Sequence, residues 1–195
     1  MVDMLRGFLE PGFALYGGEA CRAIVPAMRA YLEREREAGS LLVFLADTHD
    51  PSDEEFQMFP AHCVRGTAEV EIIPELADLA ATAIVVPKRR YSGFFDTPLE
   101  IILRDRVVAE VAVVGVMTDI CVLHTTADLR NRDYPTTVVS DCVASFDPQQ
   151  HAFALHHIGA ILGARVAASA ELAGPAQVAA AVPVQGPAPA GSAAG

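Results

Sequence analysis

Short apolar runs alternate along this chain with longer segments whose apolar residues recur at helical spacing. Four runs have the character of buried strands: LLVFLAD at 41–47, AIVVPK at 83–88, EVAVVGV at 110–116 and TTVVSD at 136–141. Strands that alternate with helices are typical of a parallel sheet with crossover connections on its faces. The pattern predicts an α/β, Rossmann-like fold of three layers, in which a mostly parallel central sheet has helices on both faces.

The helical segments carry their own boundary signals. Residues 18–39 predict a long amphipathic helix that is disturbed at Pro26 and ends near Gly39. A second helix is expected in DTPLEIILRD, with Thr97 as its N-cap and Pro98 at its first position. Further helices are expected after Thr118 and after Pro148.

Length and composition predict one folded domain and a tail. The chain has 195 residues, of which 52% are hydrophobic, enough for one substantial core. We expect this domain to span residues 1–172. Residues 173–195 are rich in Ala, Pro and Gly and poor in large apolar side chains. Such a segment cannot offset the entropy of ordering, so we expect a disordered tail without a catalytic role.

Charge and cysteine usage exclude several classes of protein. The net charge of −11 argues against binding to nucleic acid or to an anionic membrane, because phosphate binding needs clustered Lys and Arg. No apolar run approaches the roughly 18 residues that span a bilayer. The four cysteines are widely spaced, at positions 21, 63, 121 and 142. We therefore expect a soluble cytoplasmic protein without disulfides.

The segment GVMTDICV at 115–122 is the most informative part of the chain, because an apolar strand there runs through a turn into a helix that begins with Cys121. A helix N-terminus carries partial positive charge and free N–H groups, which lower the pKa of a thiol. Cys121 is therefore a candidate nucleophile. The alternative is a small buried hydrophobe, the usual role of a free cysteine.

Other reactive side chains follow the predicted strands. Ligands bind beyond the carboxyl ends of strands in an open parallel sheet. Asp3 follows Met1 and Val2, Lys88 ends AIVVPK, and Cys121 lies just past EVAVVGV. A nucleophilic thiol needs a base for its proton and a cation beside its thiolate, which Asp3 and Lys88 would supply. Each charge taken alone has the simpler interpretation of a solvated loop residue.

A second group of residues has the chemistry of a metal site. The stretch ADTHDPSDEEFQMFPAHC contains Asp47, His49, Glu55 and His62. Such a mixed nitrogen and oxygen set suits one divalent ion, with Zn favoured and Mn or Fe possible. An acidic surface loop would have a similar composition.

These residues fall within motifs of a known family. The chain resembles the nicotinamidases of the isochorismatase-like cysteine hydrolase superfamily over nearly its whole length before the tail. The motifs that carry the resemblance are Asp3 with Phe8, Asp47-Thr48-His49, Pro60-Ala61-His62-Cys63, Gly66-Thr67, KRRYSGFF at 88–95, GVMTDICVLHT at 115–125 and ASFDPQQHAFAL at 144–155.

The resemblance implies a catalytic apparatus and a reaction. It implies a triad of Asp3, Lys88 and Cys121, a cis peptide between Val116 and Met117, and an oxyanion hole formed by the N–H groups of Met117 and Cys121. The metal ligands would be Asp47, His49, His62 and Glu55, with Glu54 as the alternative to Glu55. Phe8 and Tyr91 are candidates for contact with the substrate ring, and core packing is their alternative role. The implied reaction is hydrolysis of nicotinamide to nicotinate and ammonia in NAD salvage, by a homo-oligomer.

Two alternatives to this function stay open. Another amidase or ureidohydrolase of the same superfamily would share the triad, and relatives of that kind generally lack the full metal set. A non-catalytic family member with a binding role is the other alternative.

Several histidines are expected to have no ligand role. His124 follows Cys121 by three residues and could pair with the thiol, but the triad already supplies activation. His151, His156 and His157 have the spacing of packing or surface residues on a late helix.

The amino-terminal strand is expected to be short. Only Met1 and Val2 precede Asp3, whereas strands commonly run five or six residues. Either the start lies upstream or the strand is weak and holds Asp3 poorly. We favour the first and expect a version extended by apolar residues to be more stable.

Overall fold

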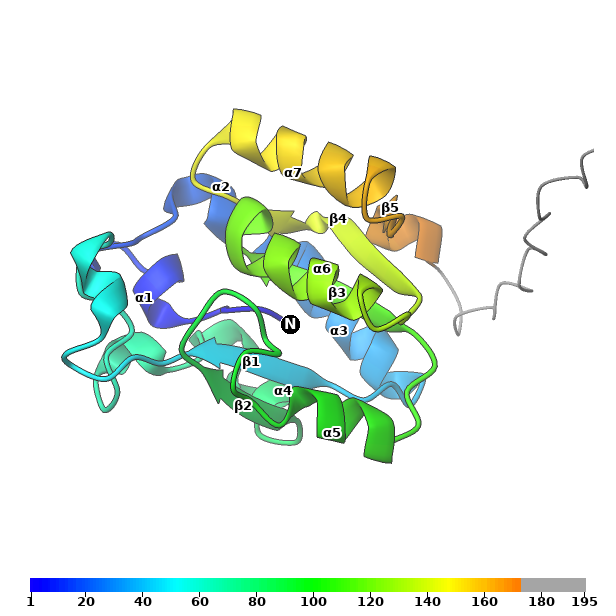
Figure 1. The fold of residues 1–195 in the computed structure, drawn as a ribbon, viewed down its shortest axis with the longest axis horizontal. Helices are drawn as coiled ribbons and strands as arrows, with labels where there is room; N and C mark the ends of the chain where they lie inside the picture. Colours follow the sequence, from blue (N-terminus) through cyan, green and yellow to red (C-terminus); the bar gives the residue numbers. More distant parts are fainter. Residues whose placement is uncertain (173–195) are drawn as a thin grey trace, which may run out of the picture.

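The computed structural model describes residues 1–172, and it has parallel strands in its centre (Figure 1). The predicted tail, 173–195, lies outside the described residues. Two sets of strands, β2-β1 and β3-β4-β5, pair in parallel within each set. Val2 joins them, because it forms parallel bridges to both Leu45 and Gly115. The strands are β1 (Val43–Asp47), β2 (Ile84–Lys88), β3 (Val111–Val116), β4 (Thr136–Ala144) and β5 (Arg165–Ala167).

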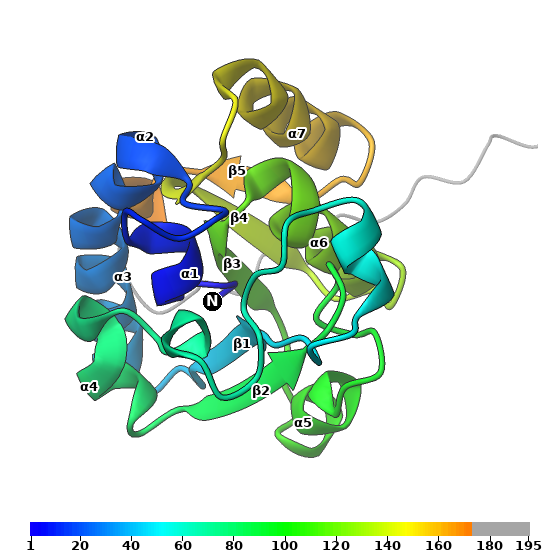
Figure 2. The same ribbon diagram turned by 90° about the vertical axis from the view of Figure 1, so that its left-hand side faces the viewer.

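Helices cover both faces of the sheet, which confirms the predicted three-layer α/β architecture. In Figure 2, α2, α3 and α4 lie on one side of the strands and α5, α6 and α7 on the other. The helices are α1 (Arg6–Leu9), α2 (Gly18–Ala23), α3 (Val25–Glu37), α4 (Ala77–Ala80), α5 (Leu99–Asp105), α6 (Leu123–Arg130) and α7 (Pro148–Ala160). Within the described residues no helix is both long and apolar enough to cross a bilayer.

The helix boundaries follow the signals in the sequence. The predicted long helix is divided at Ile24 into α2 and α3, with Pro26 in the first turn of α3. A proline has no N–H to donate to the preceding turn, so it fits the start of a helix and breaks its interior. The second predicted helix, α5, begins one residue later than expected, with Pro98 rather than Thr97 at its N-cap position, although Thr97 Oγ1 accepts a hydrogen bond from the N–H of Leu99 at 3.2 Å.

The first residues do not form a regular strand, but Val2 forms isolated parallel bridges between β1 and β3 in the middle of the sheet. Met1 accepts a hydrogen bond from Leu45, and Val2 is bonded to β3 on its other side, donating to the Val114 carbonyl at 2.8 Å. The pairing covers only the carboxyl-terminal parts of β1 and β3. Toward their amino ends lies a cavity of about 1080 Å³, lined by both strands.

A glycine permits this central pairing. Gly115 has φ +126°, and a Cβ atom built on it would lie 2.0 Å from the carbonyl oxygen of Val2. No real side chain tolerates that distance. The first residues of the chain therefore reach β3 only because position 115 has no side chain.

Two strand features differ from the prediction. The run predicted at 136–141 continues to Ala144, since β4 is irregular opposite Gly115 and then resumes its pairing with β3. The edge strand β5 was not predicted, because Arg165–Ala167 is too short for a recognisable periodicity.

Candidate active site

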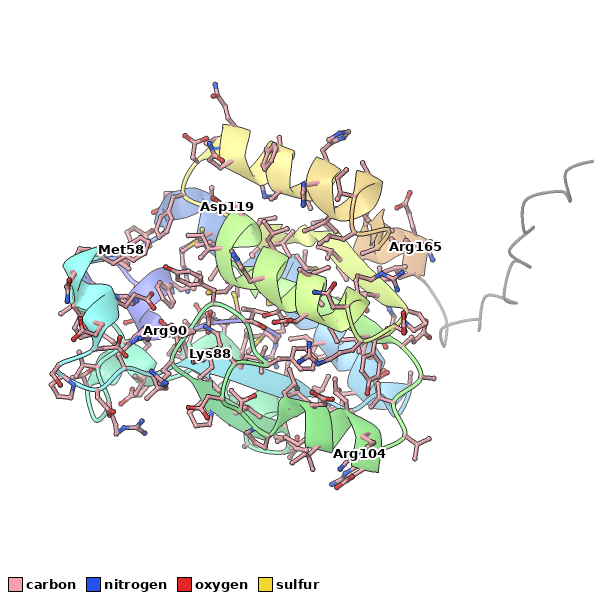
Figure 3. All side chains as sticks on the ribbon, in the orientation of Figure 1. Met58, Lys88, Arg90, Arg104, Asp119 and Arg165 are labelled. Atoms are coloured by element: carbon pink, nitrogen blue, oxygen red, sulfur yellow. The ribbon has the colours of Figure 1, made fainter. Side chains whose placement is uncertain are left out.

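Asp3, Lys88 and Cys121 meet at the carboxyl end of the sheet, as the sequence predicts. The Lys88 ammonium lies 2.8 Å from Asp3 Oδ2 and 3.5 Å from Cys121 Sγ. Its side chain is fully buried, in the middle of the molecule, whereas Arg104 and Arg165 lie at the periphery (Figure 3). Because Asp3 and the thiol contact the same ammonium, a proton can pass between sulfur and carboxylate beside a fixed positive charge.

Asp3 is held firmly, which argues against the less favoured alternative of a weak strand that holds it poorly. Its N–H donates to the Leu45 carbonyl at 3.0 Å, and its Oδ1 accepts from the N–H of Asp47 at 2.9 Å. Its φ of 52° lies in the left-handed region, where aspartate is one of the tolerated residues. The chain turns away from the sheet at this residue, leaving the carboxylate beside Lys88.

Of the three residues, Asp3 has the pKa that suits proton transfer near neutrality. Burial raises the pKa of Asp3 to about 6, Lys88 opposes the rise, and Asp47 adds to it. Burial disfavours the Lys88 ammonium, yet Asp3, Cys121 and Asp47 raise its pKa well above the usual value. Asp3 can therefore accept and return a proton near neutral pH while Lys88 stays charged.

The expected lowering of the thiol pKa is wrong. Burial raises the pKa of Cys121 well above its ordinary value, and Lys88 only partly offsets this rise. The cysteine also does not begin the helix: it lies in a π-helical turn, Thr118–Val122, that precedes α6. Burial thus outweighs any effect of the helix N-terminus, and Cys121 rests as a thiol that needs a base.

The turn follows a cis peptide bond between Val116 and Met117, where the resemblance implies one. Met117 is buried and lines the same pocket as Cys121. The oxyanion hole of the Met117 and Cys121 N–H groups stays a prediction.

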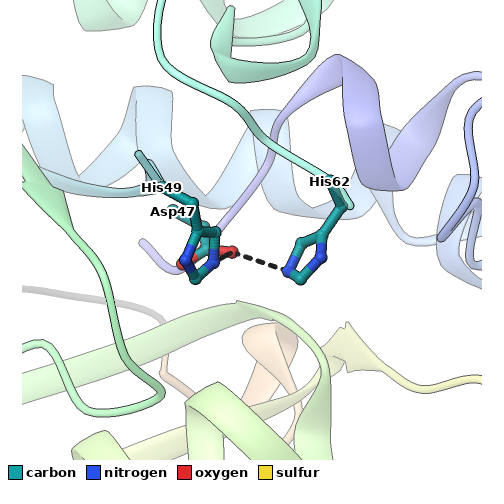
Figure 4. A group of neighbouring side chains, drawn as sticks. All are labelled: Asp47, His49 and His62. Atoms are coloured by element: carbon teal, nitrogen blue, oxygen red, sulfur yellow. Dashed lines mark hydrogen bonds and ion pairs between the residues drawn. The ribbon is translucent and has the colours of Figure 1, made fainter. Parts of the chain in front are cut away.

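Asp47, His49 and His62 form a compact group beside the triad (Figure 4). Asp47 Oδ2 lies 3.0 Å from His49 Nε2 and 3.3 Å from His62 Nε2. Ligands about 2.1 Å from one ion stand roughly 3.0 to 3.4 Å apart, so these separations fit a shared ion. The other Asp47 oxygen lies 3.3 Å from Lys88 Nζ, which links this group to the triad.

The surroundings of both imidazoles also fit a metal. His62 Nδ1 lies 2.8 Å from the Pro60 carbonyl oxygen, and His49 Nδ1 lies 3.1 Å from Asp53 Oδ2. With its Nδ1–H directed at the Pro60 carbonyl, His62 presents the lone pair of Nε2 toward Asp47. His49 Nδ1 forms no hydrogen bond within the described chain and has only the ion-pair contact with Asp53. Although burial opposes it, Asp47 and Asp53 raise the pKa of His49, so this position favours positive charge. The donor set, with nitrogen and carboxylate oxygen, suits Zn, Mn or Fe.

Glu55 lies at the edge of this group. Its carboxylate lies close to His49 and Asp53, but it does not belong to the compact group of Asp47, His49 and His62. Its buried Oε2 has no hydrogen-bond partner within the described chain. Arg90 Nη1 is 3.6 Å away from it. Glu54 is exposed and bonds to Gln57, so Glu55 is the better placed of the two carboxylates.

Sequence reasoning missed Asp53. Its carboxylate contacts both His49 and Arg90, at 3.1 and 2.9 Å, and its side chain accepts from the N–H of Glu55. Burial opposes ionisation, but Arg90 lowers the pKa of Asp53. Asp53 therefore orients His49 as a carboxylate. Its position four residues after a candidate ligand was the only signal available.

One pocket joins the triad and the metal group. Phe8 and Tyr91, the predicted ring contacts, both line it. Phe8 also packs on His62, with ring centroids 5.8 Å apart. The sequence analysis did not single out four further lining residues, which are Leu15, Phe59, Ile120 and Phe146. Phe146 stands inside the ASF motif and Phe59 directly precedes the PAHC motif, so both had a detectable signal.

The remaining histidines lie away from the metal group. His124 is exposed, with its Nδ1 2.7 Å from the Ile120 carbonyl oxygen and its ring against Tyr91. His156 is exposed on α7. His151 is half-buried, and it contacts Thr118 of the nucleophile turn.

Comparison with known proteins agrees with this geometry. The family model described as the isochorismatase domain matches residues 1–171. The chain belongs to the isochorismatase family. The isochorismatase family protein PncA of Bacillus subtilis is 34% identical over 175 residues, which cover 85% of this chain and 96% of PncA. An Arabidopsis thaliana relative described as a probable inactive nicotinamidase is 28% identical over 161 residues, covering 77% of this chain and 82% of the relative.

Solved structures of this family have the same fold. The pyrazinamidase/nicotinamidase of Streptococcus mutans is 35% identical with a TM-score of 0.81, covering 85% of this chain and 96% of that chain. An N-carbamoylsarcosine amidase from Thermoplasma acidophilum is 33% identical with a TM-score of 0.79, covering 89% and 96%. The pyrazinamidase of Pyrococcus horikoshii in complex with zinc is 30% identical with a TM-score of 0.77, covering 86% and 96%. The chain is thus a hydrolase of the isochorismatase family.

Proposed function

We propose that this chain hydrolyses nicotinamide to nicotinate and ammonia through a thioester on Cys121, as a step of NAD salvage. The observation that carries the proposal is the bridge made by Asp47, which contacts Lys88 through one oxygen and His49 and His62 through the other. One pocket thereby offers a nucleophile for an amide carbon and a cation-binding group for the rest of the substrate. Likeness to a pyrazinamidase/nicotinamidase supports this choice of substrate.

Acylation would begin with proton transfer. Asp3 takes the thiol proton, and the sulfur of Cys121 attacks the carboxamide carbon while Lys88 stabilises the negative charge. The carbonyl oxygen becomes an oxyanion, for which the N–H groups of Met117 and Cys121 are the candidate donors. Asp3 then gives its proton to the nitrogen, the carbon–nitrogen bond breaks, and ammonia leaves the thioester behind.

Deacylation would use the same groups in reverse. Asp3 accepts a proton from water, whose oxygen attacks the thioester carbon. The carbon–sulfur bond breaks, the proton on Asp3 returns to Cys121, and the acid leaves as nicotinate after it loses its own proton to solvent. A carboxyl whose pKa is about 6 is suited to both directions of transfer near neutral pH.

Asp47, His49 and His62 would hold a divalent ion, for which we propose zinc, with Glu55 as the additional ligand. When bound, the ion would supply a Lewis-acidic contact for the pyridine nitrogen of the substrate. Phe8 and Tyr91 would contact the ring from the pocket wall. The zinc complex of the Pyrococcus pyrazinamidase supports this assignment.

The test is ammonia release from nicotinamide by purified protein, with metal quantified on the same sample. Turnover that is lost in Cys121→Ala, with about one zinc per chain, is the expected result. N-carbamoylsarcosine is the competing substrate to assay in parallel, because an amidase that acts on it has the same fold at 33% identity. Turnover of that substrate alone would overturn the proposal, as would a failure to release ammonia from nicotinamide by zinc-loaded protein.

A further inference from the structure

The turn that carries Cys121 is tied by side chains to the segment that enters α7. Thr118 Oγ1 lies 2.9 Å from His151 Nδ1, and the hydroxyl of Ser145 donates a hydrogen bond to Asp119 Oδ1. Thr118 and Asp119 are the first two residues of the π-helical turn, so both tethers act within three residues of the nucleophile. Figure 3 places Asp119 where α6 begins, next to the loop that enters α7.

The irregularity of β4 brings Ser145 to this turn. Val113 pairs with Val138, but Val116 pairs with Ala144, so β4 advances six residues while β3 advances three. An unshifted register would pair Val116 with Asp141, which instead bonds to Ser169, two residues past the end of β5 on the other side of β4. The extra residues of β4 therefore place Ser145 beside the cis peptide and the turn that follows it.

Helix α7 fixes the position of His151. Asp147 caps the helix, since its Oδ1 accepts from the N–H groups of Gln149 and Gln150 at 2.6 and 3.1 Å. The N–H of His151 itself donates to the Asp147 carbonyl at 2.9 Å. His151 thus projects from a capped, ordered first turn. Burial lowers the pKa of its half-buried imidazole, although Asp119 opposes this.

We propose that Ser145 and His151 are positioning residues for Cys121. In the described chain neither side chain lines the pocket, yet the two tethers hold the turn in which Sγ stands 3.5 Å from Lys88 Nζ. Thr118 is completely buried, so a loss of its partner leaves a hydroxyl that must shift to find another. This gives a role to the motif ASF...H at 144–151. It contributes the two tethering residues, Ser145 and His151, and the pocket residue Phe146, which lies between them in the sequence.

The expected effect falls on turnover rather than on substrate binding. A displacement of about 1 Å at a reacting group can lower a rate by about a hundredfold. The pocket residues that would contact the ring, Phe8 and Tyr91, lie on other segments of the chain. We therefore expect His151→Ala to lower kcat by about tenfold to a hundredfold and to leave KM within about twofold.

The first experiment compares His151→Ala with His156→Ala, a histidine exposed on the same helix. Hydrogen–deuterium exchange of residues 117–123 should become about tenfold faster in His151→Ala and stay unchanged in His156→Ala. His151→Asn places a polar atom near the position of Nδ1 and should restore slow exchange and most of kcat. Equal exchange and equal kcat in the two alanine variants would overturn the proposal, as would a uniform rise in exchange across the whole protein.

A second set keeps the proposal testable if His151→Ala fails to fold. Thr118→Val preserves the shape and removes the hydroxyl, whereas Thr118→Ser preserves the hydroxyl. Asp119→Asn retains an acceptor for Ser145, and Asp119→Ala does not. We expect hydrogen exchange to be faster in Thr118→Val than in Thr118→Ser, and faster in Asp119→Ala than in Asp119→Asn. The reverse order would overturn the proposal that these contacts hold the turn.

The kinetic part of this inference rests on the proposed function, whereas hydrogen exchange does not. If the wild-type protein releases no ammonia from nicotinamide, the proposed function fails. Exchange of residues 117–123 still decides, in that case, whether Ser145 and His151 hold the turn.

Discussion

The two sides of the pocket are built by different means. On the base side, Asp3, Asp47 and Lys88 stand at the carboxyl ends of adjacent parallel strands, and Asp47 pairs directly with Lys88 in the ladder. On the nucleophile side, Cys121 lies beyond its strand, on a turn that side chains tie to the start of α7.

This difference predicts how each side responds to change. The position of a base-side residue is a property of the sheet, and its charges are buried together, so a substitution there should reduce stability and activity at once. The position of Cys121 depends on a few polar contacts, so a substitution there should reduce turnover with little loss of stability. The following experiments test that contrast.

The largest effect is expected for Cys121→Ala. Removal of the nucleophile should lower kcat for nicotinamide by about 10⁴-fold or more, while the melting temperature changes little. Cys142→Ala is the matched control, since Cys142 is buried on β4 away from the pocket and should retain activity. Residual activity of Cys121→Ala within tenfold of wild type would exclude a thioester mechanism.

Lys88→Met should reduce both stability and activity. The substitution leaves Asp3 and Asp47 buried without their cation, which costs about 3 to 5 kcal/mol for a buried pair broken at one partner. Urea unfolding measures the stability loss, and ammonia release should fall by about 10³-fold. If Lys88→Met loses activity but unfolds like wild type, the distinction between the two sides of the pocket is wrong.

Removal of the metal should weaken the base side in particular. A ligand present at 100 to 1,000 times its dissociation constant contributes about 3 to 4 kcal/mol to the free energy of unfolding. Chelation should therefore lower the melting temperature and abolish turnover, and zinc should restore both. Cys121→Ala should show the same thermal shift, because the thiol is outside the group formed by Asp47, His49 and His62. If the chelator does not change the melting temperature, the result would argue against a metal bound by Asp47, His49 and His62.

The smallest effect is expected on zinc affinity, and it distinguishes Glu55 from its neighbour Glu54. Glu55→Gln should weaken zinc binding about tenfold, whereas Glu54→Gln should leave it within about twofold, because only Glu55 is half-buried beside His49. Competition with a chromophoric chelator measures both affinities. Equal affinities would remove Glu55 from the ligand set.

The same contrast explains what the sequence could predict. The ends of β1, β2 and β3 are marked by apolar runs that stop at polar residues, so Asp47, Lys88 and the start of the nucleophile turn could be located in advance. Because parallel strands end at one edge of a sheet, their proximity followed from the fold class. The candidate metal ligands Asp47 and His49 could be located for the same reason, since Asp47 ends β1 and His49 lies two residues beyond it.

Contacts that depend on side-chain packing could not be predicted in this way. The pKa of Cys121 was expected to fall because its helix position was considered without its burial. Asp53 was missed because an aspartate in an acidic loop has no distinguishing pattern. The contact between Thr118 and His151 joins residues 33 positions apart, and it depends on a strand irregularity that leaves no period in the sequence.

Gly115 makes the site sensitive to substitution at a residue that does not itself line the pocket. A methyl group there would collide with the carbonyl oxygen of Val2, one residue before Asp3. Accommodation of that methyl would push the first residues out of the sheet and carry the carboxylate away from Lys88. In a random mutagenesis screen, substitutions at position 115 should therefore reduce activity as strongly as substitutions at Cys121, although they act only through a steric collision. The absence of a side chain at Gly115 on β3 thus helps to keep Asp3, the proposed general base, beside Lys88.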